Sequence, residues 1–177
     1  RPGLPRWHLC FLSSTHVCLG FSDPANAAPW PMGFPRLKRP PRAPSRSGLK
    51  LDEAFLSFLS PAELTERLQP GMQAVDLGAA PGGWSWQLTR RGLWVTAIDN
   101  GPLAPELLAT GRVRHLQVDG FRYRPPRQVD WLVCDIVEQP ERIARLMAHW
   151  FVQGWCRNAI FNLKLPMRKR YEEVQRC

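Results

Sequence analysis

A repeated pattern of short apolar runs, each closed by a charged residue, constrains the fold of this chain more than any other feature. The runs occupy residues 72–77, 93–99, 113–119, 129–135 and 158–165. The charged residues at or near their ends are Asp76, Asp99, Asp119, Asp135 and Lys164. Helical segments lie between them at residues 83–92 and 140–155, and another begins at residue 168. Near-continuous apolar strands that alternate with helices predict an α/β fold with a mostly parallel sheet covered on both faces.

The charged residues at the strand ends indicate where a ligand would bind. Open parallel sheets bind ligands beyond the carboxyl ends of their strands, where the strand order reverses. A single aspartate after a strand is as often a turn former or a helix cap as a functional group. Charged residues at successive strand ends are hard to explain in that way. The pattern therefore predicts a binding site at this edge of the sheet.

The size and composition of the chain fit a globular protein. It has 177 residues, of which 44% are hydrophobic and 22% are charged, which is enough for one domain with its own core. No apolar run approaches the ~18 residues of a membrane span, and the start does not resemble a signal peptide. The first residue is Arg1, so we expect a piece of a longer protein, with no membrane partner.

The positive charge is concentrated in the first part of the chain. Residues 1–51 hold eight Lys and Arg against one acid, a net charge of +7, and the remainder holds 16 against 14, a net charge of +2. A basic segment beside a nearly neutral domain suits a polyanionic partner such as RNA or DNA. A solvated basic linker is the alternative, and charge alone does not separate the two.

Residues 1–44 differ in composition from the rest of the chain, because they contain nine of the 18 prolines. Alternating residues at 7–12 and 15–21 predict a hairpin with histidines and cysteines on one face. The H-x-C-x5-H-x-C spacing matches none of the usual zinc frameworks, so we predict no metal site. The five cysteines form no CxxC and are odd in number, which favours a reducing, cytoplasmic location. We divide the chain into residues 1–35, a hairpin with a basic connector, and residues 36–177, the α/β domain.

The stretch VDLGAAPGGW, residues 75–84, predicts a loop after the first strand of the sheet. Its spacing fails the dinucleotide pattern G-x-G-x-x-G, and Trp84 stands where a phosphate-binding loop needs lysine. D-x-G-x-x-P-G-G instead looks like the first motif of S-adenosylmethionine methyltransferases, whose glycines admit the methionine end of the cofactor. Asp99 follows the second strand, where an acid can accept hydrogen bonds from ribose hydroxyls. Asp119 follows the third, where an acid can contact the adenine amino group.

The polar groups near the later strands favour methylation of a hydroxyl. Amine methylation typically uses [DN]-P-P-[YF], and this chain has CDIVEQP instead. Methylation of a pyrimidine carbon needs a cysteine nucleophile, and Cys134 is predicted to point into the core. Lys50, Asp135 and Lys164 suit deprotonation of a hydroxyl, for which a lysine must be neutral. We interpret Asp135 as the group that orients the lysine, with in-line positioning supplying much of the rate.

Five segments of the sequence resemble the FtsJ-type RNA ribose methyltransferases: SRSGLKLDEAF, DLGAAPGGWSWQL, DNGP, VCDIVE and FNLKLPMRKRYEEV. The similarity covers the chain from about Arg6. It implies a Rossmann-like methyltransferase fold, preceded by a ferredoxin-like and THUMP RNA-binding part of which the hairpin would be the tail end. It also implies transfer of a methyl group from S-adenosylmethionine to the 2′-hydroxyl of a cytidine in large-subunit (23S) ribosomal RNA.

The same resemblance implies roles for individual residues. Lys164 would be the proton acceptor, and Lys50, Asp135 and Lys164 would be three members of a Lys-Asp-Lys-Glu tetrad. The residues implied to contact the cofactor are Ser47, Ala80, Pro81, Gly82, Gly83, Asp99, Asp119 and Asp135. The fourth tetrad member and the last sheet strands are expected beyond Cys177. We therefore expect an incomplete, monomeric enzyme fragment with an exposed sheet edge.

The sequence is also compatible with two other functions. An RNA-binding scaffold without turnover would keep the basic arm but would not need the two lysines. A small-molecule O-methyltransferase would need the lysines but not the basic arm. Salt-sensitive activity on RNA separates the ribosomal RNA methyltransferase from both.

Overall fold

The computed structural model describes residues 3–28 and 30–177 and divides the chain into two compact units, Arg1–Arg36 and Leu37–Cys177. In the first unit, strands β1 (Arg6–Phe11) and β2 (Val17–Ser22) form the predicted antiparallel hairpin. Two short 3-10 turns follow, η1 (Pro24–Asn26) and η2 (Pro31–Gly33).

The hairpin has one apolar face and one polar face. The register pairs Trp7 with Phe21, Leu9 with Leu19 and Phe11 with Val17, and all six side chains are exposed. The opposite face carries His8, Cys10 and Cys18, as predicted, whereas His16 lies in the turn and bonds to Ser13 and Thr15. In the part of the chain that the structure describes, no cluster of three His, Cys, Asp or Glu residues could hold a metal ion.

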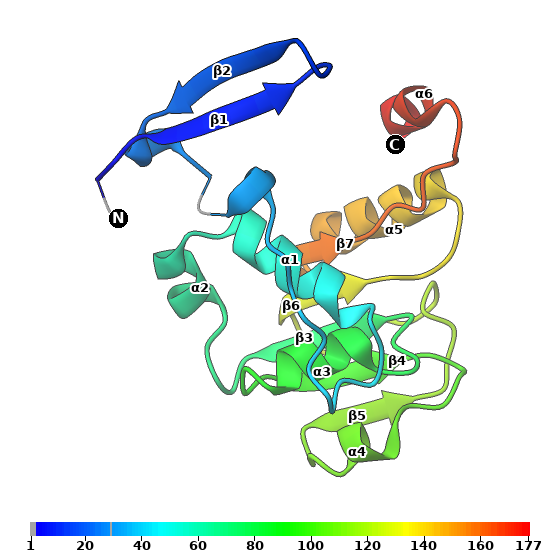
Figure 1. Ribbon diagram of the computed structural model, residues 1–177. Coiled ribbons are helices and arrows are strands. Elements are labelled where there is room, and N and C mark those ends of the chain that lie inside the picture. The colour runs from blue at the N-terminus through cyan, green and yellow to red at the C-terminus, as the bar shows by residue number, and fades with distance from the viewer. Residues whose placement is uncertain (1–2, 29) are drawn as a thin grey trace. The chain divides into compact units, whose positions relative to one another are not determined.

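The second unit is built on a five-stranded sheet in which all neighbouring strands are parallel, as predicted (Figure 1). Its strands are β3 (Gln73–Leu77), β4 (Trp94–Ile98), β5 (Val113–Leu116), β6 (Val129–Cys134) and β7 (Cys156–Phe161). Their order is β5-β4-β3-β6-β7. The chain therefore moves outward from β3 to β5 and then returns to pair β6 with β3. This reversal is the position at which such sheets bind ligands.

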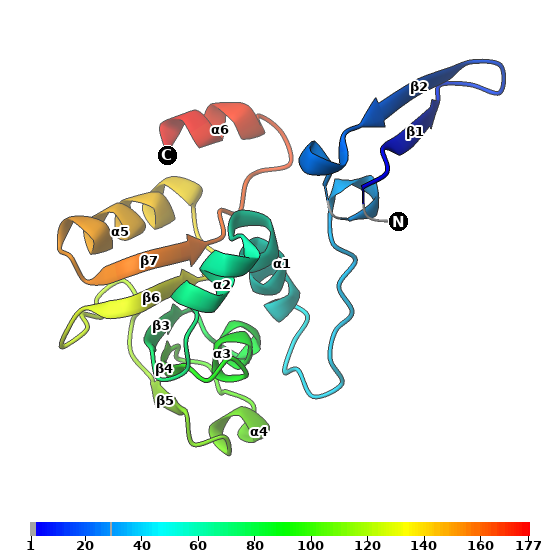
Figure 2. The ribbon, with the colours of Figure 1, turned by 90° about the vertical axis from the view of Figure 1, so that its left-hand side faces the viewer.

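Helices cover both faces of this sheet (Figure 2). The helices α1 (Gly48–Phe58), α2 (Pro61–Arg67), α3 (Gly83–Thr89) and α4 (Pro105–Leu108) lie on one side, and α5 (Pro140–Val152) lies on the other. A short last helix, α6 (Arg170–Arg176), ends the chain. None of the helices in the described ranges 3–28 and 30–177 is long and apolar enough to cross a membrane.

The core is split by the sheet into two layers, because alternate residues of a strand point to opposite faces. Ala74 and Val95 belong to the layer under α1 and α3. Val75 and Leu132 belong to the layer under α5, which also holds Trp150.

Two strands differ from the sequence prediction by more than one residue at an end. β5 ends at Leu116 rather than at Asp119, and β7 runs from Cys156 to Phe161 rather than over residues 158–165. Pairing with β6 sets the register of β7, because Val129 lies opposite Cys156 and Cys134 lies opposite Phe161. Register depends on the neighbouring strand, which an apolar run cannot reveal by itself.

Helices α1 and α3 approach each other closely at two glycines. A Cβ atom placed on Gly48 would lie 2.6 Å from the carbonyl oxygen of Gly83, and a Cβ on Gly83 would lie 2.4 Å from Ser47 Oγ. At the other end of the contact, Arg91 Nη2 lies 2.5 Å from Asp52 Oδ1. The two helices therefore meet backbone to backbone at the end nearest the glycine loop.

We expect Gly48→Ala to destabilise the protein by about 1–3 kcal/mol, because the added methyl group meets a backbone carbonyl that cannot move aside. Urea unfolding measures the change. Gly120→Ala is the matched control, since the nearest atom to its added Cβ would be 3.4 Å away. Equal stabilities for the two variants would contradict the close approach of α1 and α3.

Candidate active site

The loop between β3 and α3 is held by backbone hydrogen bonds to the end of β4. The amide groups of Gly78 and Ala79 donate to the carbonyl oxygen of Ile98, at 2.9 and 3.3 Å. The next amide, that of Ala80, donates to Asp99 Oδ2 at 2.9 Å. The loop therefore has a fixed position relative to Asp99 before any ligand binds.

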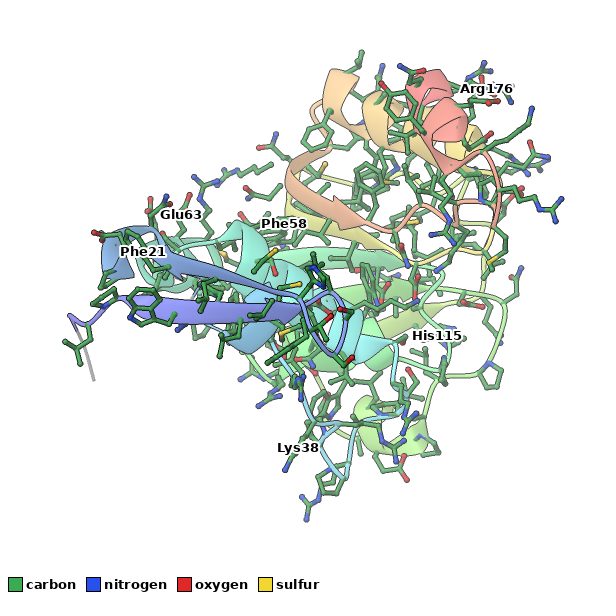
Figure 3. The ribbon with its side chains drawn as sticks, turned by 45° about the horizontal axis from the view of Figure 1, so that its top comes forward. Phe21, Lys38, Phe58, Glu63, His115 and Arg176 are labelled. Carbon is green, nitrogen blue, oxygen red and sulfur yellow. The ribbon has the colours of Figure 1, made fainter. Side chains whose placement is uncertain are left out.

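Asp99 is itself fixed from two further directions. Its Oδ1 accepts a hydrogen bond of 2.7 Å from the amide of Gly101. Its carbonyl oxygen lies 2.9 Å from Nε2 of His115, which extends from β5 and is labelled in Figure 3. Each carboxylate oxygen has a second lone pair, so Asp99 can still accept hydrogen bonds from a diol.

The glycines of the loop are required by the protein's own packing. A Cβ on Gly78 would lie 2.6 Å from the side chain of Ile136, and a Cβ on Gly82 would lie 2.3 Å from Leu107. Both residues have positive φ angles, 76° and 113°, which glycine adopts at low cost. The absence of side chains there thus serves internal packing directly, in addition to any approach of a ligand.

A pocket of about 330 Å³ opens beside this loop, at the carboxyl ends of β3, β4 and β6. Asp99 and Asp119 are on its wall, together with the apolar side chains of Ile98, Val118 and Ile136. Asp119 lies three residues beyond β5 rather than at its end. Its Oδ1 accepts a hydrogen bond of 2.9 Å from the amide of Phe121. A carboxylate beside apolar walls suits a nucleoside, with a diol at one end and a flat base at the other.

A second pocket, of about 290 Å³, adjoins the first and shares with it Gly78, Ala80, Asp135 and Val137. Its other lining residues are Ser45, Ser47, Lys50, Ala79, Pro81, Trp84 and Lys164. Trp84 Nε1 donates a hydrogen bond of 2.9 Å to the carbonyl oxygen of Ser47. That bond holds Ser47, the residue that precedes α1, against the loop between β3 and α3.

Lys50, Asp135 and Lys164 meet in this second pocket, although they are far apart in the sequence. Lys50 Nζ lies 3.2 Å from Asp135 Oδ2, and Lys164 Nζ donates a hydrogen bond to Asp135 Oδ1. Burial pushes the pKa of Asp135 upward, but hydrogen bonds from Lys164, Asn162 and Lys50 outweigh it, so the pKa lies below its ordinary value. Asp135 is therefore a stable anion between two lysine side chains.

Asn162 is a member of this cluster that the sequence analysis missed. Its Nδ2 donates a hydrogen bond of 3.0 Å to Asp135 Oδ1. Its amide nitrogen also donates to the carbonyl oxygen of Cys134 at 3.0 Å, which extends the pairing of β7 with β6 by one residue. The available signal was the two-residue spacing between Asn162 and Lys164, because such residues of an extended chain share a face.

Two other polar groups near the site are fully buried. Asp76 accepts a hydrogen bond of 2.8 Å from Ser85 Oγ, and its other carboxylate oxygen has no partner in the described structure. Burial raises the pKa of Asp76 to about 7, with the Asp135 and Asp99 carboxylates adding to the shift. Burial also raises the pKa of Cys134 to about 12, which fits its predicted core position and excludes it as a nucleophile at neutral pH.

These residues fit S-adenosylmethionine. Two carboxylates, of Asp99 and Asp135, line the first pocket at the point where the strand order reverses, and the cofactor carries a positive sulfonium. The first pocket offers Asp99 for the ribose and apolar walls for the adenine. The second pocket continues from it to the two lysines.

The strand order, the loop after β3 and the acid after β4 are those of the Rossmann-like fold of S-adenosylmethionine-dependent methyltransferases. Within that class the chain belongs to the FtsJ-like methyltransferase family, whose model matches residues 43–162. The matched range contains all the residues that line the first pocket and all but Lys164 of those that line the second.

Curated relatives match the chain over its whole length. It is 58% identical over 177 residues to the ribosomal RNA large subunit methyltransferase M of Xanthomonas oryzae pv. oryzae (strain PXO99A), covering all of this chain and 51% of that protein. It is 60% identical over 177 residues to the protein of the same name from Alkalilimnicola ehrlichii, covering all of this chain and 49% of that protein. The chain thus spans about half the length of these relatives.

Among solved structures, the chain is similar to a putative ribosomal RNA methyltransferase from Plasmodium falciparum. The TM-score is 0.53 at 14% sequence identity, and the similarity covers 75% of this chain and 84% of that one. At this identity the comparison supports the fold alone.

The raised pKa of Asp76 predicts a pH-dependent stability. The folded chain keeps a proton between pH 3.8 and about 7 that the unfolded chain releases, so the folded state loses stability as the pH rises through this window. We expect Asp76→Asn, which cannot ionise, to gain about 3 kcal/mol relative to the native chain between pH 5 and pH 8. Urea unfolding at the two pH values measures this difference. If the difference in unfolding free energy between the two proteins were the same at both pH values, Asp76 would ionise normally.

Proposed function

We propose that this chain is part of an enzyme that transfers a methyl group from S-adenosylmethionine to the ribose 2′-hydroxyl of a cytidine in large-subunit ribosomal RNA. The observation that carries the proposal is the position of Lys50, Asp135 and Lys164. They lie in the second pocket, which is continuous with the first pocket, where a nucleoside would fit. A hydroxyl that enters this pocket meets a proton acceptor and the cofactor site at once.

The cofactor, when bound, supplies the methyl group from its sulfonium. The protein's own groups position the hydroxyl and take its proton. Lys164, in its neutral form, accepts the proton, while Asp135 orients the lysine through the hydrogen bond to its Nζ. Lys50 and Lys164 share one carboxylate in the described structure, so an ammonium group remains to stabilise the oxygen anion as it forms.

Cofactor binding would use the residues placed around the first pocket and the loop. Asp99 would accept the ribose hydroxyls, and Asp119 would contact the adenine amino group at the rim of the pocket. Ser47 and the loop residues Ala80, Pro81, Gly82 and Gly83 would contact the methionine end. Ser47, Ala80 and Pro81 line the second pocket, which supports this arrangement.

Ribosomal RNA as the substrate rests on charge and on the relatives. The net charge of +9, with +7 in residues 1–51, suits a polyanion better than a small neutral substrate. Curated relatives that are 57–60% identical carry the name ribosomal RNA large subunit methyltransferase M. We further propose a monomeric enzyme that acts in the cytoplasm and needs no metal.

Residues 1–35 would form the tail of a THUMP-like RNA-binding domain and its connector, and residues 36–177 the methyltransferase domain. The exposed apolar face of the hairpin, with Trp7, Leu9 and Phe21, supports this division. A two-stranded hairpin is marginally stable alone and needs further structure to cover such a face.

We expect Lys164→Ala to lower the rate of methyl transfer by about 100-fold or more, because a positioned general base contributes this much. The experiment measures transfer from labelled S-adenosylmethionine to unmodified large-subunit ribosomal RNA by the full-length protein. Binding of S-adenosylhomocysteine should stay within about threefold, which checks that the cofactor pocket is intact.

Lys169→Ala is the matched control, because Lys169 is an exposed lysine that forms an ion pair with Glu172, at 3.5 Å, away from Asp135. Its rate should equal that of the native protein. A Lys164→Ala rate within a factor of a few of native would refute the base assignment. Equal activity on a short nucleoside, insensitive to salt, would refute RNA as the substrate.

A further inference from the structure

A groove lies on the sheet at the end away from the two pockets of the candidate active site. It has a volume of about 360 Å³, and its lining residues include the first residues of β3, β4 and β6, namely Gln73, Trp94 and Val129. We call it the arginine groove and define it by Trp94, Thr96, Arg112, Arg114, Tyr123 and Arg127. None of the described residues that line it is acidic.

The arginine groove exists because α5 covers only part of its side of the sheet (Figure 2). Under α5, the strand positions on this side hold apolar residues such as Val75 and Leu132. On β5 the corresponding position is Arg114, since Val113 packs on the opposite side against the α1 and α3 layer. The described chain places a loop, residues 117–128, on this side of β5 instead of a helix.

The arginines of the groove have no carboxylate partners among the residues that the structure describes. Arg112, Arg114 and Arg127 form no ion pair with any residue in the ranges 3–28 and 30–177. Arg112 is held in place, because its guanidinium lies 5.2 Å from the centre of the Trp94 ring and its Nη1 donates to the carbonyl oxygen of Gly92 at 3.0 Å. Guanidinium groups without a carboxylate partner suit phosphate oxygens.

Aromatic side chains accompany these charges. Tyr123 lines both the arginine groove and an adjoining hollow of about 420 Å³, whose wall includes Arg124 and Trp155. The guanidinium of Arg124 lies 5.9 Å from the centre of the Trp155 ring. Between residues 112 and 127 the chain has five arginines and one acid. Basic side chains interleaved with aromatic rings are the features of a surface that binds single-stranded nucleic acid.

We propose that the arginine groove binds the phosphodiester backbone of the RNA substrate, at a distance from the nucleotide that is methylated. Strands of five residues separate the groove from the active site, a distance of about 17 Å. One strand of stacked nucleic acid carries a phosphate about every 3.4 Å, so about five nucleotides would bridge the two sites. This inference rests on RNA being the substrate, but it concerns binding and does not depend on turnover.

The test uses the full-length protein with Arg114→Gln and Arg127→Gln combined. Binding of an unmodified, in vitro transcribed fragment of large-subunit ribosomal RNA is measured from 50 to 300 mM salt. A plot of the logarithm of the RNA association constant against the logarithm of the salt concentration has a negative slope. Loss of two phosphate contacts should make this slope less steep by about 1.4. Affinity should fall about tenfold at 100 mM salt, KM for RNA should rise equally, and kcat should stay within twofold.

The matched control combines Arg67→Gln with Arg90→Gln, which removes the same charge from α2 and the end of α3 on the opposite side of the sheet. This control should bind RNA like the native protein, and an equal loss of affinity in both double variants would overturn the proposal. Modification of the native protein by phenylglyoxal supplies a second measurement. Arg114 and Arg127 should react in free protein and be protected by RNA.

Two outcomes of the modification experiment would also overturn the proposal. Failure of Arg114 and Arg127 to react without RNA would mean that another part of the protein covers the groove. Reaction that RNA does not slow would mean that RNA binds elsewhere. A third outcome separates the two proposals. If RNA protects the two arginines but no methyl group is transferred, the proposed function is refuted and the assignment of the groove stands.

Discussion

The parallel pairing of β3 with β6 is the interaction on which the candidate site depends. It sets Leu77 opposite Cys134, so the loop after β3 and Asp135 after β6 emerge side by side at the same edge of the sheet. The amide of Asp135 also donates to the carbonyl oxygen of Leu77 at 3.3 Å. Because β6 comes after β5 in sequence but pairs with β3, this is the position where two loops diverge and leave room for a ligand.

Close packing of backbone against backbone fixes the loop above that edge. Gly48 and Gly83 let α1 and α3 touch, and this contact brings Lys50 to the site from the start of α1. The same stretch of glycines that resembles a cofactor-binding motif is therefore needed to assemble the site. Packing alone requires glycine at Gly48 and Gly83, so loss of function on substitution there would not by itself show that either residue contacts a ligand.

Much of the fold could be predicted from the sequence because each element carries a local signal. Near-continuous apolar runs located the five strands, and the helical segments between them located α3 and α5. The exact ends of β5 and β7 could not be predicted, because they depend on pairing with neighbouring strands. Asp119 and Lys164 thus lie three residues beyond their strands, although both line the predicted pockets.

The same limit applies to residues whose role depends on a distant partner. Asn162 reaches Asp135 only because β7 pairs with β6. The two-residue spacing of Asn162 and Lys164 places both on one face of an extended segment, but it does not identify Asp135 as the partner. Arg114 is a second residue whose place in a site depends on a distant element. In sequence it interrupts an apolar run and resembles an ordinary surface residue of an edge strand. Only the position of α5, which leaves that side of β5 to a loop, turns it into part of a groove.

The two ends of the sheet carry charges of different kinds. At the carboxyl ends, Asp99 and Asp135 are held by backbone amides and lysines, which suits a cationic cofactor and a single reacting hydroxyl. At the amino ends, arginines that form no ion pair within the described part of the chain lie beside aromatic rings, which suits a polyanion without regard to its sequence. A rigid sheet between them would let distant contacts with RNA position the reacting ribose while leaving the chemistry of Lys164 unchanged. We therefore expect substitutions at opposite ends of the same strands to alter the affinity for RNA and the turnover separately.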